Sequence, residues 1–166
     1  MDSIIPALLA VGILLLASLM LGRSSFTSFS TLSDSWKSAE DRSIERLRSD
    51  ISVDSISVSG ADIDVTILND GATSLVDFSR MDIVVQYESG GSNLIKYIDF
   101  TTTTSPQPDD TWRVLSVNDD VIDPGIVNTS ESMTIRIKLS PSVTAGDHWL
   151  QVTTELGISA SSFFTT

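Results

Sequence analysis

Two segments with different spacings of apolar residues make up the chain, and they meet near residue 50. Residues 4–21 carry no charged side chain, and apolar positions then recur mostly every three or four residues as far as residue 51. This spacing places an apolar stripe on an α-helix. We therefore predict one helix from about Ser3 to Asp50, with Ser3 as its N-cap and Pro6 tolerated in its first turn.

Beyond residue 50, apolar and polar residues alternate, which is typical of strands with one buried face. Turn sequences such as Asn69–Gly71 and Glu88–Gly91 separate the alternating stretches. About seven to nine short strands of this kind predict an all-β sandwich, with an immunoglobulin-like Greek key as the default architecture. The predicted strands are Ile51–Val58, Ala61–Ile67, Ile83–Tyr87, Leu94–Ile98, Trp112–Leu115, Val121–Ile122, Met133–Leu139, His148–Val152 and Ile158–Phe164.

The predicted fold class is α+β, with a long N-terminal hydrophobic helix in residues 1–50 and an immunoglobulin-like β-sandwich in residues 51–166. The chain has no cysteine, which excludes disulfides and thiol nucleophiles. Its single histidine, His148, excludes sites that need two imidazoles, and we interpret it as a strand-edge residue. No nucleotide fingerprint or G-x-S-x-G motif occurs, so we expect no enzymatic activity, no cofactor, no metal and no small-molecule substrate.

The net charge of −12 limits the kinds of partner that the chain can bind. Residues 1–50 hold five basic and six acidic side chains, a balance of −1, which leaves −11 for residues 51–166. An acidic surface of this kind lacks the basic footprint that nucleic-acid binding needs. It is typical of an exterior exposed to water or salt.

Three interpretations of residues 4–21 compete. A secretory signal peptide needs basic residues before the apolar run, whereas the first charged residue here is Asp2. A transmembrane anchor is physically sound, because such a run spans roughly 27 Å as a helix. The third interpretation is the helical core of a polymer, favoured because the helical pattern continues past Gly22 without a linker.

Two sets of helix positions carry the polymer hypothesis. The first set is predicted to pack helices together in a filament core, and the second to pack the helix against the β-domain. The filament-core positions are Ile4, Ile5, Leu8, Leu9, Val11, Ile13, Leu15, Leu16, Leu19 and Met20, and the domain-packing positions are Phe26, Phe29, Leu32, Trp36, Ile44 and Leu47.

A helix joined without a linker to a β-sandwich resembles archaellins, the archaeal flagellin subunits of the type IV pilin-like superfamily. The stretch Val65–Gly71 followed by Met81–Val85 is similar to the V-x-N-x-G … D-V-x-V pattern of archaellins and their accessory proteins, and Asp147–Ile158 is similar to their late hairpin. The resemblance implies removal of a short leader, polymerisation through the N-terminal helices and frequent glycosylation. Ile5 stands where bacterial type IV pilins usually carry Glu, which favours the archaellin branch.

Two stretches are candidates for modification, and three acidic clusters are candidates for calcium. Asn128–Ser130 is an N-glycosylation sequon, and the Thr-rich stretch 101–105 is a candidate for O-glycosylation. Asp62 and Asp64, Asp109 and Asp110, and residues 118–120 each offer oxygen ligands, but none has EF-hand spacing. We interpret these clusters as solvated turns.

The leading hypothesis is the subunit of an extracellular, archaellum-like helical filament for motility or adhesion, inserted in the membrane before assembly and then bound to copies of itself. The alternative is a membrane-anchored accessory protein of the same machine, whose β-domain binds the cell envelope. Because both need the same apolar helix and the same sandwich, the sequence leaves the choice open.

Overall fold

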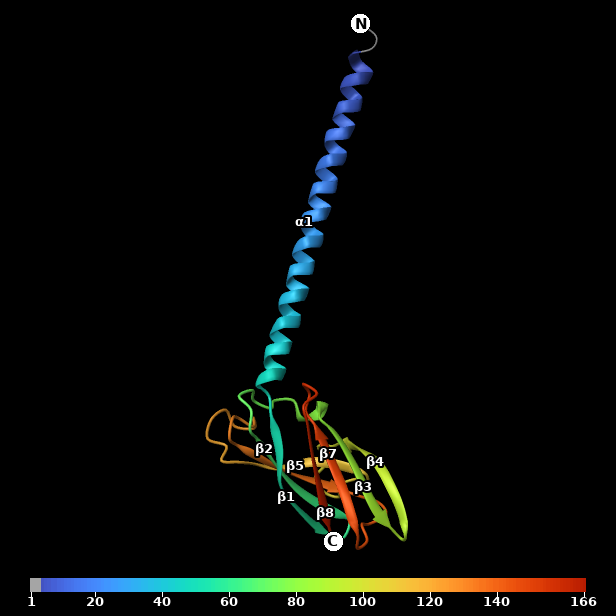
Figure 1. The fold of residues 1–166 in the computed structure, drawn as a ribbon, viewed down its shortest axis with the longest axis vertical. Helices are drawn as coiled ribbons and strands as arrows, with labels where there is room; N and C mark the ends of the chain where they lie inside the picture. The colour runs from blue at the N-terminus through green and yellow to red at the C-terminus, as the bar shows by residue number, and fades with distance from the viewer. Residues whose placement is uncertain (1–3) are drawn as a thin grey trace. The chain divides into compact units, whose positions relative to one another are not determined.

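The computed structural model describes residues 4–166, and within the helix it leaves out the side chains of residues 4–7, 21–28 and 30. The described part contains one long helix, a short 3-10 helix and eight strands (Figure 1). Two compact units divide it, the first ending at Ile44 and the second beginning at Glu45. The elements are α1 (Ile4–Arg48), β1 (Ile51–Ser59), β2 (Asp62–Asn69), η1 (Phe78–Arg80), β3 (Asp82–Ser89), β4 (Ser92–Phe100), β5 (Thr111–Asn118), β6 (Ser132–Lys138), β7 (Asp147–Thr153) and β8 (Ser159–Thr165).

The helix α1 agrees closely with the predicted range. In its serine-rich middle, serine hydroxyls donate to carbonyl oxygens four residues earlier, as Ser35 does to Thr31 at 2.8 Å and Ser38 to Asp34 at 2.9 Å, so these side chains bond within the helix and do not interrupt it. Among the residues whose side chains the structure describes, which within the apolar segment are residues 8–20, no helix combines the length and the apolar character needed to cross a membrane.

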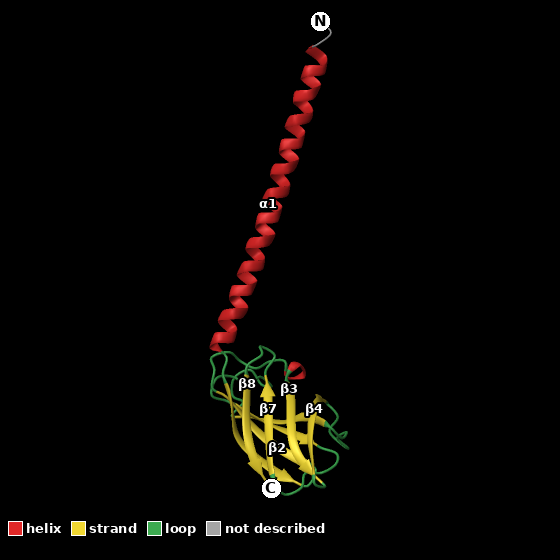
Figure 2. Cartoon of the chain, turned by 45° about the vertical axis from the view of Figure 1, so that its right-hand side comes forward, coloured by secondary structure: helices red, strands yellow, loops and turns green. Residues whose placement is uncertain are grey.

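The eight strands run in the order β1-β2-β6-β5-β4-β3-β7-β8, and nearly all neighbours are antiparallel. The exception is the short parallel pairing of β4 with β5, where Asp99 lies opposite Thr111 and Phe100 opposite Trp112. This pairing joins two four-stranded halves, β1-β2-β6-β5 and β4-β3-β7-β8. Because β8 lies near β1 at the other end of the order, the halves close over a common core (Figure 2).

The core consists of the inward residues of both halves. Trp112 of β5 is fully buried, and its ring lies edge-on to Phe100 with a centroid distance of 4.8 Å. The buried positions of β2, β3, β6 and β7 alternate strictly with less buried ones, as the sequence pattern predicts. The predicted all-β sandwich is confirmed.

Two local predictions are wrong. Val121–Ile122 forms no strand and lies in an exposed loop, because two apolar residues between turn sequences are too few to pair. His148 is no strand-edge residue, since β7 lies between β3 and β8 and the side chain is only 1% exposed. Its Nδ1 accepts a hydrogen bond from the backbone N–H of Glu88 at 3.2 Å, which ties β7 to β3.

Candidate assembly surfaces

The helix positions predicted for the filament core are exposed in the single chain wherever their side chains are described. Leu15, for example, is 61% exposed. The side chains of Ile4, Ile5 and Phe26 lie outside the part that the structure describes. The described filament-core positions are Leu8, Leu9, Val11, Ile13, Leu15, Leu16, Leu19 and Met20.

The helix positions predicted to pack on the β-domain are also solvent-exposed where they are described. Phe29, Leu32 and Trp36 line a shallow depression of about 230 Å³ on the helix itself. Ile44 and Leu47 follow them along α1 and are exposed as well. The packing of this stripe against the domain stays a prediction.

The last turn of α1 belongs to the β-domain unit, and the loop after β2 holds it. Ala72 donates its backbone N–H to the carbonyl oxygen of Arg48 at 2.7 Å, and the Thr73 hydroxyl donates to the carbonyl of Glu45 at 3.2 Å. These bonds satisfy carbonyl groups that a helix end leaves without partners. At Gly71 the backbones approach so closely that a Cβ atom would lie 2.3 Å from the nitrogen of Asp50.

Asn69 is the first residue of the N-x-G motif, Asn69–Gly71, and its hydrogen bonds explain why asparagine stands there. Its side chain is fully buried, its Oδ1 accepts from the N–H of Gly71 at 3.1 Å, and its Nδ2 donates to the carbonyls of Thr73 and Val127, both at 3.0 Å. One buried amide thus fixes the loop that receives the helix end. The motif is therefore structural in this chain.

The outer surface of β4-β3-β7-β8 is the candidate assembly surface, and we call it the apolar face. Phe163, Ile95 and Tyr97 are 80%, 70% and 57% exposed. Strand pairing sets the apolar side chains in two rows, since Ile95, Gln86, Trp149 and Phe163 lie opposite one another in turn, and Tyr97 lies opposite Val84 in the next row. Exposed side chains of this size in one patch indicate an interaction site.

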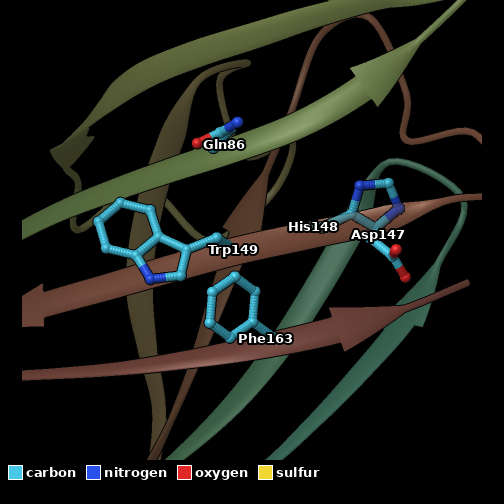
Figure 3. A pocket seen from close by; sticks show the side chains of 5 residues that line it. All are labelled: Gln86, Asp147, His148, Trp149 and Phe163. Atoms are coloured by element: carbon cyan, nitrogen blue, oxygen red, sulfur yellow. The ribbon is translucent and has the colours of Figure 1, made fainter.

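A surface depression of about 390 Å³ lies at one end of this face. Trp149 of β7 and Phe163 of β8 lie next to each other on the near side of the sheet, and Asp147 lies farther along β7 (Figure 3). Gln86 and His148 complete its lining. This depression combines two aromatic surfaces with one carboxylate and contains no pair of groups arranged for acid–base or nucleophilic chemistry.

Two of the three acidic clusters considered for calcium form ion pairs, whereas in the third Asp120 accepts a hydrogen bond from the backbone N–H of Gly125. Asp64 accepts two hydrogen bonds from the Arg136 guanidinium, at 2.7 and 2.6 Å, and these bonds raise the pKa of Arg136. Asp110 accepts from Lys96 at 2.6 Å and raises the pKa of that ammonium group, which also donates to the carbonyl of Ser140. Among the described residues, no group of three or more potential ligands could hold a metal ion.

Asn128 of the sequon is tied into its own turn. Its Nδ2 donates to the carbonyl of Ile122 at 2.5 Å and to Glu131 at 3.2 Å, and its Oδ1 accepts from the Ser74 hydroxyl at 3.0 Å. A glycan on Nδ2 would take the place of one of its two hydrogens, so only one of these two donated bonds could remain. Glycosylation of Asn128 stays a prediction.

Sequence reasoning missed the apolar face, although the sequence carries a signal for it. Strands with one solvated face alternate, whereas strands covered on both faces read as continuous apolar runs. Ile83–Val85, Trp149–Leu150 and Phe163–Phe164 are such runs, with consecutive apolar side chains on opposite faces of the sheet. Consecutive apolar residues in these strands therefore indicate apolar side chains on both faces of the sheet.

The comparisons with known proteins confirm the predicted immunoglobulin-like domain. The family model "Conserved flagellar protein F, immunoglobulin-like domain" matches residues 47–160, and the chain belongs to this family. No curated protein sequence matches the chain.

Two solved structures from Sulfolobus acidocaldarius share the fold. The archaellum periplasmic stator protein complex FlaF and FlaG has a TM-score of 0.51 at 16% identity, with 69% of this chain and 87% of that chain covered. The archaellum periplasmic stator protein FlaG has a TM-score of 0.51 at 18% identity, with 70% and 99% covered. At these identities the likeness concerns the fold.

These findings correct the leading hypothesis. The family is that of flagellar protein F, a component of the archaellum and not the archaellin that forms its filament. The predicted link to the archaellum is therefore correct, and the predicted identity as a filament subunit is not. The predictions of a filament subunit and of a homo-oligomeric helical filament are wrong, and the comparisons do not support an extracellular filament location. The reason is physical: an apolar helix followed by a sandwich serves a filament core and a membrane-proximal protein equally well.

Proposed function

We propose that this chain is a non-enzymatic accessory component of the archaellum machinery in the cell envelope. Its N-terminal apolar segment holds it at the membrane, and its β-domain binds a different protein of the same machine in a hetero-complex. The observation that carries the proposal is the family match over residues 47–160. One structural neighbour is itself a stator complex of two different proteins, FlaF and FlaG, which supports a hetero-complex in particular.

The distribution of charge and apolar residues supports the membrane part of the proposal. Residues 4–21 carry no charge, and as a helix they extend roughly 27 Å, close to the ~30 Å hydrocarbon thickness of a bilayer. The first basic residue after this segment in the sequence is Arg23, and a basic residue at such a place suits the interface between lipid and water. In this arrangement the fold consists of an anchoring helix and a sandwich domain.

The β-domain supports the binding part. Its core and its ion pairs make a rigid scaffold, and it presents a broad apolar surface instead of a reactive cleft. Rigid surfaces of this kind bind proteins with little loss of conformational entropy.

Membrane extraction and co-purification test the proposal together. We expect the full chain to pellet with membranes, to be released by mild detergent and not by high salt, and to bring a second archaellum accessory protein with it in a fixed ratio. Leu15→Asp places a carboxylate in the apolar segment at a cost of about 2.5–3.5 kcal/mol at the centre of a membrane helix, and should release the chain.

The matched control is Ser38→Asp, an exposed helix position outside the apolar segment. This variant should stay with the membrane fraction. A wild-type chain that is soluble without detergent, or one recovered from membranes with no second archaellum protein, would contradict the proposal.

A further inference from the structure

The two outer faces of the sandwich differ sharply in polarity. On β1-β2-β6-β5 the outward positions are mostly polar, with Leu68 and the exposed Leu115 as the described apolar exceptions, and the outward side chains of β1 between Ser55 and Ser59 are serines. On β4-β3-β7-β8 the corresponding central positions are Ile95, Tyr97 and the other members of the apolar face. Only the second surface has the composition of a protein contact.

The charges on the apolar face are of one sign. Lys96 is the only Lys or Arg in its four strands, and it alternates with the outward Ile95 and Tyr97, so it points to the other side and binds Asp110. The outward charged residues of these strands are Asp82, Glu88, Asp99 and Asp147.

Basic residues of the domain are concentrated on the opposite surface. Arg113, Arg136 and Lys138 are outward on β5 and β6, and each has a described partner, namely Gln107, Asp64 and Asp109. Residues 51–166 carry a charge of −11, yet the four described strands of the apolar face contribute no outward basic side chain to balance their carboxylates. The net field there favours a positively charged partner.

We infer that the apolar face docks a partner protein whose contact surface has an apolar centre bordered by Lys and Arg. This inference rests on the proposed function in that it specifies the surface used for the hetero-complex. Exposed parts of Phe163, Ile95 and Tyr97 together amount to on the order of 400 Å² of apolar surface, about half of what each partner buries in a standard interface. The acidic border and Trp149 supply the rest.

The depression next to Phe163 is where we expect a basic side chain of the partner protein to bind. A Lys or Arg side chain that enters it lays its aliphatic stem on Trp149 and Phe163 and brings its charge to Asp147. A second copy of this chain is a poor occupant, since a two-fold contact through this face sets its carboxylates against the same carboxylates. An anionic lipid surface is repelled by the same charges.

Site-specific photo-crosslinking tests the inference on the full chain in its own membranes. A photoreactive amino acid replaces Phe163 in one sample and Ser57, on the polar outer face, in the control; both positions are exposed. We expect crosslinks from position 163 to one segment of a second archaellum protein, with Lys or Arg flanking its apolar residues, and few from position 57. Crosslinks from 163 mainly to a second copy or to lipid would overturn the inference.

A binding measurement with the hetero-complex partner complements the crosslinks. Phe163→Ser should weaken co-purification at least tenfold, and Asp147→Asn should slow association and reduce its salt dependence, whereas Ser57→Ala should change neither. A hetero-complex that forms with normal affinity in Phe163→Ser and crosslinks only through position 57 overturns the docking surface and leaves the proposed function standing. Absence of any hetero-complex with the wild-type chain overturns both.

Discussion

Removal of the Asn69 amide should lower the free energy of unfolding of the β-domain markedly. Substitution by Ala removes three side-chain hydrogen bonds from a fully buried position, two donated to the carbonyls of Thr73 and Val127 and one accepted from Gly71. A net value of about 1 kcal/mol for each bond gives ~3 kcal/mol. The small cavity left by the amide adds to this.

The surroundings of Asn69 limit that figure. The carbonyl of Val127 also accepts from Leu75, and the N–H of Gly71 also donates to Asp50, so these two groups keep a partner in the variant. Thr73 contributes the carbonyl for which no second partner is described. We therefore expect a loss of about 2–4 kcal/mol in the free energy of unfolding.

Urea unfolding of the full chain in mild detergent, followed by the circular dichroism of the β-domain, measures this loss. Asn118→Ala is the matched control, because Asn118 lies on the polar outer face and its Nδ2 donates to the hydroxyls of Ser132 and Thr134. Asn118 is only half-buried, so water can replace its hydrogen bonds in the variant, and the loss should be below about 1 kcal/mol. Equal losses for the two variants would refute the structural role assigned to Asn69.

Three further predictions concern side chains and backbone elsewhere in the domain. Gly71→Ala should destabilise the domain by more than about 2 kcal/mol in the same assay, since its Cβ would collide with backbone, whereas Gly60→Ala, with open space but φ of 64°, should cost about 1 kcal/mol; equal costs would contradict the close approach. Tyr87→Phe should change the unfolding free energy by less than about 1 kcal/mol, because the buried hydroxyl has no hydrogen-bond partner in the described structure; a loss above about 2 kcal/mol would show a missed bond. The hydrogen bond to Asp82 raises the pKa of Tyr97 above 10.0, so its stabilising contribution is complete below pH 10 and disappears as pH rises through the folded-state pKa; Asp82→Asn should move the phenolate absorbance step to lower pH, and an unmoved step would refute this cause.

The strands could be predicted from the sequence because each buried face imposes a period of two. The strictly alternating burial of β2 and β6 follows from Ile63–Ile67 and Met133–Ile137. The predicted strand Val121–Ile122 was wrong because two apolar residues are too few to show a period of two. The location of His148 needed the order of the strands, which only long-range pairing shows.

The function was harder to predict, for a physical reason. Residues 4–21 are apolar all round, and burial in lipid and burial among copies of the same helix favour the same residues. The evidence that separates the two is the family match over residues 47–160 in the β-domain. Sequence reasoning also missed the proposed docking surface, where Trp149 and Phe163 lie outward beside a carboxylate. That arrangement depends on strand register, so it was visible in the sequence only as runs of consecutive apolar residues.

The partition of the chain between filaments and membranes tests the central claim most directly. Filaments sheared from cells and detergent extracts of the remaining membranes are compared by quantitative mass spectrometry of this chain. We predict that the chain is absent from the filaments and is recovered in the membrane extract in a fixed ratio to another archaellum accessory protein. Recovery of this chain as the bulk protein of the sheared filaments would contradict the account.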